Sequence, residues 1–347
     1  MRIIVAASPG ETRAVAIDAE GRAVDFALFR PSAPDGIGDL YRGRVTAIAP
    51  ALGGAFVSLG EGADSFLPDT EGAAGVAEGA LVPVRVTRAA QSAKGPRLSA
   101  RLDEIVPPGP VGLVRRGPDP IRRLAALIPN APIERAGLAF DPALEAELAA
   151  LAEPVVALPG GAILRIHPTP ALVAIDLDAG AAASARGPAR ATHRALNRAA
   201  IPEIARQIRL RNLSGAILVD LAGLSPRERR PLADAFRAAL APDPLAPRFL
   251  GLTALGFAEI VRPRVAPPLH ELLLTPHAAG LAALRALASE TLAAPAGAWA
   301  LRAAPAVVSA LEQDPAALAE LARLTGRPLI LRSDPALARA RWSLDPL

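Results

Sequence analysis

Three aspartates at the ends of two apolar segments are the residues of this chain best suited to hydrolytic chemistry. Asp176 ends the segment ALVAID, Asp178 follows two residues later, and Asp220 ends GAILVD. Two carboxylates close together raise each other's pKa unless a cation neutralises them. Mg²⁺ (or Mn²⁺) is a hard ion that takes one or two carboxylates and leaves positions for phosphate oxygens. Asp176 and Asp220 are therefore candidate metal ligands and catalytic residues, with Asp178 as a further ligand or neighbouring acceptor, in a site that polarises a phosphodiester.

These aspartates need two neighbouring strands to bring them together. Both apolar segments are continuous, which predicts strands buried on both faces of a parallel or mixed sheet. Residues 177–219 are long enough to hold a crossover helix, so the strands are expected to lie side by side and parallel. Their carboxyl ends then open at one edge, where ligands of open α/β sheets bind. The structural alternative is that each aspartate only caps a helix or a turn.

Arginines are concentrated between the two strand ends. Lys94 is the only lysine of the chain, and residues 186–237 hold eleven arginines against four acidic residues. Such a patch suits a polyphosphate partner, although a solvated helix face remains the alternative. Pro202 is expected to kink or end the helix in this region before EIARQIRLRNL restarts it. The arginines favoured for phosphate contact, four of them spaced as one helical row, are Arg186, Arg190, Arg194, Arg198, Arg206 and Arg209.

A run of short β-like segments precedes this region. Between Asp39 and Leu102 these segments alternate with Gly, Pro and Asp turns at ~10-residue intervals, which predicts a small closed or nearly closed barrel. Exposed aromatic residues on such barrels stack on bases, beside cations that hold the backbone. Filling of the barrel core is the alternative role. The aromatic residues of the first 66 positions are Phe26, Phe29, Tyr41, Phe56 and Phe66.

Other segments give a coarser picture. Residues 1–30 alternate like two strands, and helices are expected at 121–128 and 142–152. After residue 161 the pattern becomes α/β, and residues 271–347 are typical of a small α/β appendage.

Composition excludes several classes of protein. The chain has 347 residues, 51% of them hydrophobic, which is enough for a sizeable core in two or three modules. It has no cysteine, so disulfides, thiol nucleophiles and cysteine zinc sites are excluded. Its four histidines lack metal-site spacing, and no apolar run is long enough to span a bilayer. The start, MRIIVAASPGETR, is unlike a secretory signal, so we expect a cytoplasmic protein without a membrane partner.

Five segments in the same order resemble the ribonuclease E/G family. Residues 39–68 and 93–102 resemble the start and closing strand of its S1-type RNA-binding barrel. Residues 171–180 and 203–221 resemble the segments that carry its two catalytic aspartates, and residues 256–264 resemble the segment beyond them. The resemblance covers most of residues 1–265. It implies a Mg²⁺-dependent endoribonuclease that cuts single-stranded, AU-rich RNA to leave 5′-phosphate and 3′-hydroxyl ends.

The resemblance also assigns roles and a fold. Asp176 and Asp220 would hold the ion, and Phe56, Phe66 and Lys94 would contact RNA, with Tyr41 beside them. The expected class is α/β with α+β character: an N-terminal hairpin with an inserted OB-fold (S1-like) barrel, then an α/β catalytic domain with a mixed sheet and a small α/β tail. The expected domains are 1–35 (hairpin packed on the catalytic domain), 36–104 (barrel), 105–158 (shortened connector), 159–268 (catalytic domain) and 269–347 (tail).

Some positions depart from the family pattern. Asp178 stands where the family usually has asparagine. Arg116 stands where the family's 5′-phosphate pocket has arginine, but Gly117 replaces the expected threonine. The family's cysteine zinc link cannot form, so any oligomer would be held together without zinc.

The rival hypotheses are a non-catalytic RNA-binding protein derived from this family and an assembly factor without an RNA role.

Overall fold

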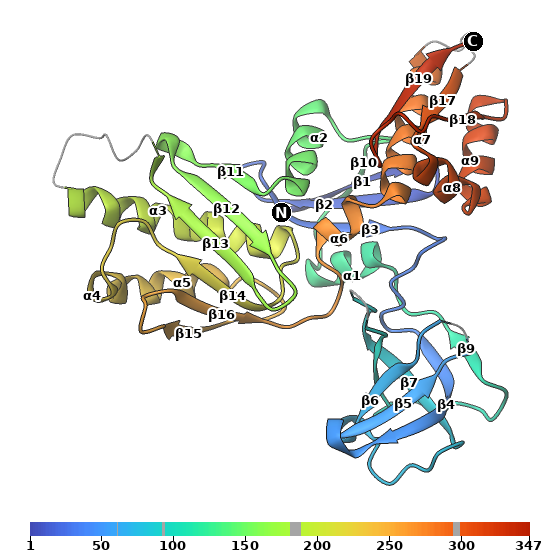
Figure 1. Ribbon diagram of the computed structural model, residues 1–347, viewed down its shortest axis with the longest axis horizontal. Coiled ribbons are helices and arrows are strands. Elements are labelled where there is room, and N and C mark those ends of the chain that lie inside the picture. The colour runs from blue at the N-terminus through green and yellow to red at the C-terminus, as the bar shows by residue number, and fades with distance from the viewer. Residues whose placement is uncertain (61, 92–93, 181–188, 294–298) are drawn as a thin grey trace. The chain divides into compact units, whose positions relative to one another are not determined.

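The computed structural model describes residues 1–60, 62–91, 94–180, 189–293 and 299–347, without the side chains of 189–191 and Pro226. The chain forms two compact units (Figure 1). Unit 1 comprises Met1–Ala27, Leu127–Arg264 and Pro268–Leu347, and unit 2 comprises Leu28–Ala126 and Val265–Pro267. A barrel and several sheets with helices give the mixed α/β class that the sequence predicts.

The chain begins with three antiparallel strands, where we expected two. A turn at Pro9–Gly10 separates β1 from β2, in addition to the expected turn near Gly21. Strand β10 adds to β1 in parallel, giving the order β10-β1-β2-β3. The Asp141 side chain caps α2 by accepting from the N–H groups of Ala143 and Leu144. These elements are β1 (Arg2–Ser8), β2 (Glu11–Ile17), β3 (Ala23–Phe29), β10 (Ile133–Arg135), α2 (Pro142–Ala149) and the 3₁₀ turn η3 (Ala150–Ala152).

Unit 2 contains the predicted barrel, which is closed. Five strands pair around a ring in the order β5-β6-β8-β7-β4 and back to β5, and β9 pairs with β4 outside the ring. Gly54 permits close strand approach, because a Cβ there would lie 2.4 Å from the Leu67 carbonyl oxygen. The elements are β4 (Leu40–Ala49), β5 (Gly54–Ser58), β6 (Ser65–Pro68), β7 (Leu81–Arg88), β8 (Arg97–Ser99), β9 (Gly112–Arg115), α1 (Pro120–Leu127) and the 3₁₀ turns η1 (Pro50–Leu52) and η2 (Asp69–Glu71).

The largest sheet of unit 1 has six strands in the order β11-β12-β13-β14-β16-β15. Only β13 and β14 pair in parallel, because helix α3 crosses between them, while the other pairs are antiparallel. The elements are β11 (Val155–Ala157), β12 (Ile163–Pro168), β13 (Val173–Asp178), α3 (Ala189–Leu210), β14 (Gly215–Asp220), α4 (Pro226–Arg229), α5 (Ala233–Leu240), β15 (Arg248–Leu252), β16 (Ala258–Arg262) and the 3₁₀ turns η4 (Pro159–Gly161) and η6 (Arg230–Leu232).

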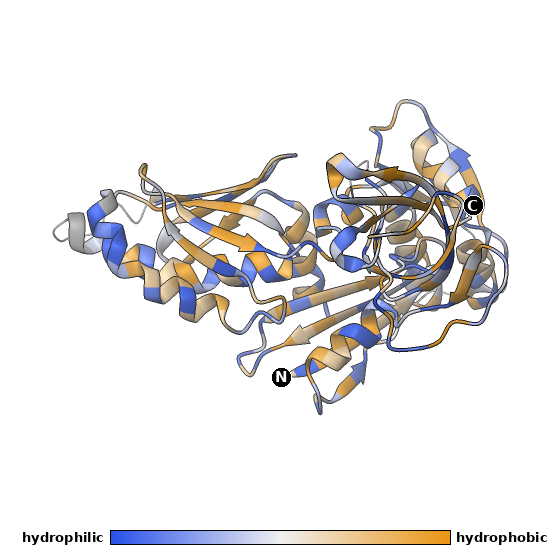
Figure 2. Cartoon of the chain, turned by 90° about the horizontal axis from the view of Figure 1, so that it is seen from below, coloured by the Kyte–Doolittle hydropathy of each residue, from blue (hydrophilic) through white to orange (hydrophobic). Residues whose placement is uncertain are grey.

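Two expectations about this sheet are wrong. Strands β13 and β14 are buried on one face only, because every second residue packs against α3 and α5 while the others lie on a partly exposed face. Helix α3 also runs through Pro202 from Ala189 to Leu210, so the expected end and restart of the helix are wrong, whereas the alternative, a kink at the proline, stays a prediction. Figure 2 shows mainly apolar residues along the strands and mixed apolar and hydrophilic residues along α3. One face of the sheet is therefore open to a ligand.

The C-terminal part of unit 1 has its own core. Helices α7, α8 and α9 pack with a three-stranded sheet of order β18-β17-β19. In the part of the chain that the structure describes, no helix combines the length and apolarity needed to cross a membrane. The elements are α6 (Leu269–Leu273), α7 (Pro276–Ala293), β17 (Trp299–Ala303), α8 (Pro305–Glu312), α9 (Pro315–Thr325), β18 (Ile330–Ser333) and β19 (Trp342–Pro346).

Candidate active site on the open face of the large sheet

Asp176 and Asp220 are direct neighbours across the parallel pair β13 and β14. Their Cα atoms are register partners, which places them about 4.8 Å apart, the usual spacing between strands. Their side chains are about half exposed, at 53% and 45%, and lie on the open face of the sheet. The predicted side-by-side arrangement of the two strands is confirmed. The catalytic and metal-binding roles of the two residues remain predictions.

Asp178 lies on the same face as Asp176 and is held by two donors. Its Oδ1 accepts from the backbone N–H of Gly180 at 2.9 Å, and its Oδ2 accepts from Nη1 of Arg165 at 2.8 Å. The Gly180 hydrogen bond, followed by that from Arg165, lowers the pKa of Asp178 below 3.8. Asp178 is therefore ionised at neutral pH and already partnered.

Sequence reasoning missed Arg165, which lies on β12 opposite Asp176. Its Nη1 also lies 3.5 Å from Asp176 Oδ2, so one guanidinium nitrogen bridges two carboxylates. The signal was available, since the alternation in AILRIHP places Arg165 between inward-facing Leu164 and Ile166. A charged residue between two buried ones is expected to face the open side.

Asp220 has its own arginine partner, Arg229 of α4. Nη1 of Arg229 donates to Asp220 Oδ1 at 2.9 Å. The same guanidinium donates to the backbone carbonyls of Leu221, Leu224 and Gly256 and is only 11% exposed. These backbone contacts fix Arg229, which in turn orients Asp220. In the described part of the chain, no protein group donates to the other carboxylate oxygen, Oδ2.

The loop after Asp220 is tied to the start of α3. The Asn197 amide donates to the Ala222 carbonyl at 2.8 Å, and the His193 ring contacts the Gly223 carbonyl at 3.2 Å. Gly223 has φ +61°, and a Cβ there would lie 2.0 Å from His193 Nδ1. Only glycine fits this close approach without displacing the ring. The contact fixes the backbone that leads away from Asp220.

The donor set suits a hard divalent cation. Carboxylate oxygens are the ligands that Mg²⁺ prefers, and Asp176 and Asp220 present them side by side on an exposed face. Within the described ranges, no group of three or more His, Asp or Glu side chains is arranged as a metal site. The protein would therefore contribute two carboxylates, for which the ion competes with the arginines described above, and water would fill the remaining coordination positions.

Comparisons with known proteins identify this region. Residues 134–265 match the model of the ribonuclease E/G family. Over these residues the chain is therefore similar to the ribonuclease E/G family. Ribonuclease E of Nostoc sp. is 39% identical over 121 residues, which are 35% of this chain and 18% of that protein. Ribonuclease E of Escherichia coli is 33% identical over 129 residues (37% and 12%), and its ribonuclease G is 33% identical over 135 residues (39% and 27%). The match thus spans about a quarter or less of these relatives.

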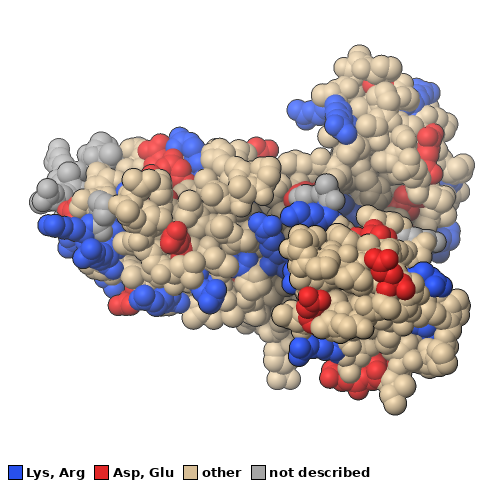
Figure 3. Space-filling model, turned by 60° about the horizontal axis from the view of Figure 1, so that its bottom comes forward, with Lys and Arg blue, Asp and Glu red and all other residues tan. Residues whose placement is uncertain are grey.

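The arginine row of the ribonuclease E/G segment is described in part. Arg186 lies outside the described residues, as does the side chain of Arg190. Arg194 and Arg198 are exposed on α3, and Arg227 and Arg230 are exposed in and just after α4. Figure 3 shows basic side chains gathered at the left of the view, the side on which Figure 1 places the start of α3 and α4. A cationic surface therefore exists beside the strands that carry the aspartates.

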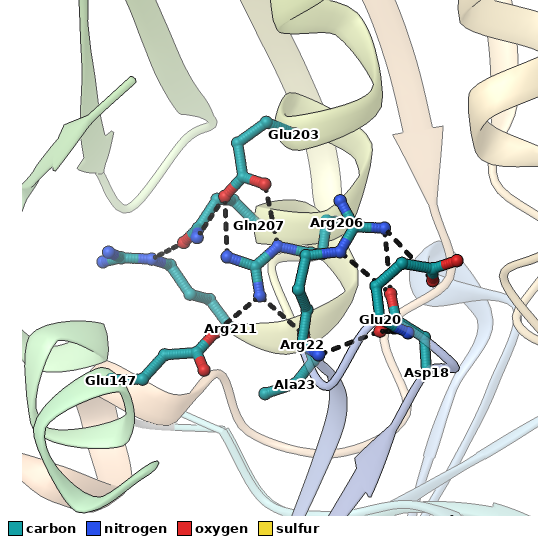
Figure 4. A network of polar contacts seen from close by, with 9 residues as sticks. All are labelled: Asp18, Glu20, Arg22, Ala23, Glu147, Glu203, Arg206, Gln207 and Arg211. Carbon is teal, nitrogen blue, oxygen red and sulfur yellow. Dashed lines mark hydrogen bonds and ion pairs between the residues drawn. The ribbon is translucent and has the colours of Figure 1, made fainter. Parts of the chain in front are cut away.

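Arg206 does not contribute to that surface. Its guanidinium is 17% exposed and donates to Glu203, to Glu147 and to the carbonyl of Ala23 (Figure 4). The pairing with Glu203 and Glu147 raises the pKa of Arg206, although burial opposes this as the largest single effect. We therefore no longer propose that Arg206 contacts phosphate, because its hydrogen-bond donors are used inside the fold.

Arg209 has a similar internal role. Its side chain is 10% exposed, and its guanidinium donates to Asp25 at 3.0 Å and to the Pro242 carbonyl at 3.1 Å. It joins α3 to the N-terminal sheet. We therefore no longer propose a phosphate contact for Arg209 either.

The barrel presents an aromatic and cationic row. Phe56 and Phe66 are register partners with ring centroids 5.7 Å apart at 65°, and both are partly exposed and outside the buried barrel core. Arg97 lies 5.9 Å from the Phe66 ring and is the register partner of Phe66 on β8. Lys94 is exposed and pairs through its backbone with Gln91. Sequence reasoning missed Arg97, the cation beside the rings.

Tyr41 and Arg116 lie together elsewhere on the barrel unit. The Asp39 carboxylate accepts from Arg116 Nη1 and from the N–H of Gly117, both at 2.7 Å. Burial, together with the negative charge of Asp39, raises the pKa of Tyr41, which packs against the barrel core. The hydrogen bond to Asp39 raises the pKa of Arg116. Arg116 is 59% exposed but already holds one carboxylate, and its contact with RNA remains a prediction.

Proposed function

We propose that this chain is a Mg²⁺-dependent endoribonuclease of the ribonuclease E/G type that hydrolyses single-stranded RNA in RNA processing or decay. The observation that carries the proposal is the register pairing of Asp176 and Asp220 within the segment that matches the family. The reaction adds water to a phosphodiester and breaks the P–O3′ bond, which leaves a 3′-hydroxyl and a 5′-phosphate. Its natural place is the cytoplasm.

Each group has a defined task in this proposal. Asp176 and Asp220 would hold a divalent cation, Mg²⁺ or Mn²⁺, which when bound offsets their charge and lowers the pKa of a water molecule. Arg229 fixes the Asp220 carboxylate through Oδ1 and leaves Oδ2 for the ion. Phe56 and Phe66 would stack on bases, while Lys94 and Arg97 bind the phosphates between them.

The test uses end-labelled single-stranded RNA with Mg²⁺, Mn²⁺ or EDTA. Cutting is expected only with metal, and Asp176→Asn and Asp220→Asn are expected to abolish it. Asp234→Asn is a matched control, because that carboxylate is 94% exposed on α5 of the same unit. Cutting that persists in EDTA or in both active-site variants would reject the proposal.

A non-catalytic RNA-binding protein is the second candidate. Arginines hold all three aspartates, Asp176 and Asp178 through Arg165 and Asp220 through Arg229, so the chain neutralises them without a metal. RNA binding by the wild type without cutting in Mg²⁺ or Mn²⁺ would favour this candidate. The third candidate is an assembly factor without an RNA role. It would be supported if any RNA binding did not weaken as salt rises, because binding through phosphate contacts does weaken.

A further inference from the structure

Arg165 is the one cation of the candidate site whose hydrogen bonds, within the described chain, go to carboxylates alone. Its Nη1 lies 2.8 Å from Asp178 Oδ2 and 3.5 Å from Asp176 Oδ2. No backbone carbonyl of the described ranges accepts from it, in contrast to Arg229, and its side chain is 38% exposed. Arg165 can therefore leave Asp176 while keeping its shorter contact with Asp178.

The three carboxylates differ in how firmly they are held. Asp178 uses both oxygens, one for Gly180 and one for Arg165. Asp220 uses one oxygen for Arg229. Among the residues that the structure describes, Asp176 has only the 3.5 Å contact with Arg165, so it is the carboxylate that an incoming cation can take most easily.

We propose that Arg165 is a built-in counter-ion that competes with the divalent cation for Asp176 and so sets the metal affinity of the site. This inference rests on the proposed function, since it concerns the same pair of aspartates. With no metal bound, the guanidinium bridges Asp176 and Asp178. If a cation were held by Asp176 and Asp220, Arg165 would keep its contact with Asp178, and its positive charge would still oppose the ion.

The expected effect follows from charge. A guanidinium that contacts one of the expected carboxylate ligands would weaken binding of a divalent ion at this solvent-exposed site by roughly tenfold once salt screening is included. Arg165→Met keeps much of the side-chain length and removes the charge, so Mn²⁺ is expected to bind about ten times more tightly. Arg165→Lys retains the charge and is expected to stay within about threefold of the wild type.

The experiment is a Mn²⁺ titration of the RNA-free full chain, followed by electron paramagnetic resonance of the free ion. Arg302→Met is a matched control, because Arg302 lies on β17 and pairs with two aspartates, Asp334 and Asp345. It is expected to leave Mn²⁺ binding unchanged, while Asp176→Asn is expected to weaken it. Circular dichroism checks the fold of each variant, and thermal unfolding with and without Mn²⁺ gives a second measure of binding.

Tighter binding in Arg165→Met, but not in Arg165→Lys or Arg302→Met, supports the inference. Equal or weaker binding in Arg165→Met overturns it, and so does the absence of Mn²⁺ binding from both the wild type and Arg165→Met. Cleavage of RNA is measured separately. If the wild type cuts RNA but Arg165→Met binds Mn²⁺ with unchanged affinity, the inference is rejected and the proposed function stands. If Arg165→Met binds Mn²⁺ more tightly but no RNA is cut, the proposed function is rejected and the role of Arg165 stands.

Discussion

RNA binding by the barrel is expected to depend on Phe56 and Phe66 together. The two side chains are partly exposed and lie outside the barrel core, so replacing them with alanine should leave the barrel folded. A stacked base is worth about 1–3 kcal/mol, so each single variant should weaken binding by about 5- to 150-fold. The ring centroids lie 5.7 Å apart, so the two rings support each other. The double variant should therefore lose about 0.5–1.5 kcal/mol less binding free energy than the sum of the two single losses.

The assay is fluorescence anisotropy of a labelled single-stranded RNA, titrated with protein in EDTA so that cutting does not interfere. Leu52→Ala is the control, because Leu52 is an apolar side chain of the same barrel that is 63% exposed. Wild-type affinity in Phe56→Ala, Phe66→Ala and the double variant would refute the stacking role. Strictly additive losses would mean that the two rings bind bases independently.

Further predictions concern stability and pH. Arg206→Met should lower the free energy of unfolding by about 3 kcal/mol, measured by urea denaturation, because it leaves partly buried carboxylates unpaired. The pKa of Glu145 is lowered by its hydrogen bonds and charge interaction with Arg13, although burial alone would raise it. A lowered folded-state pKa means that Glu145 contributes stability above its usual 4.5 and that this is lost as pH falls through the folded value. In urea melts between pH 7 and 3, Glu145→Gln should therefore lose less stability than the wild type; an identical pH dependence would contradict this. Gly223→Ala should displace His193 and lower the free energy of unfolding by about 1–2 kcal/mol, and it should reduce RNA cutting; unchanged melting would show that the loop relaxes freely.

Much of the arrangement around the aspartates follows from local patterns. Two apolar strands that each end in aspartate, joined by a segment of helical length, predicted a parallel pair with Asp176 near Asp220, which the structure confirms. The spacing of turns between Asp39 and Leu102 likewise predicted a barrel, which the structure closes. These inferences succeed because strand alternation and crossover geometry depend on residues close in sequence.

The partners of the arginines depended on the tertiary structure. Arg206 and Arg209 occupy the same helix as the exposed Arg194 and Arg198, and composition alone does not separate them. Their partners come from distant segments, such as Asp25 for Arg209, so their burial depends on packing between elements.

The sequence by itself determined where the acidic residues stand and that two strands bring them together. Only the tertiary structure decided which cations neutralise them, namely Arg165 and Arg229. The physical reason is that backbone periodicity fixes the direction of a side chain, whereas the partner of a long, flexible guanidinium depends on every chain segment within its reach.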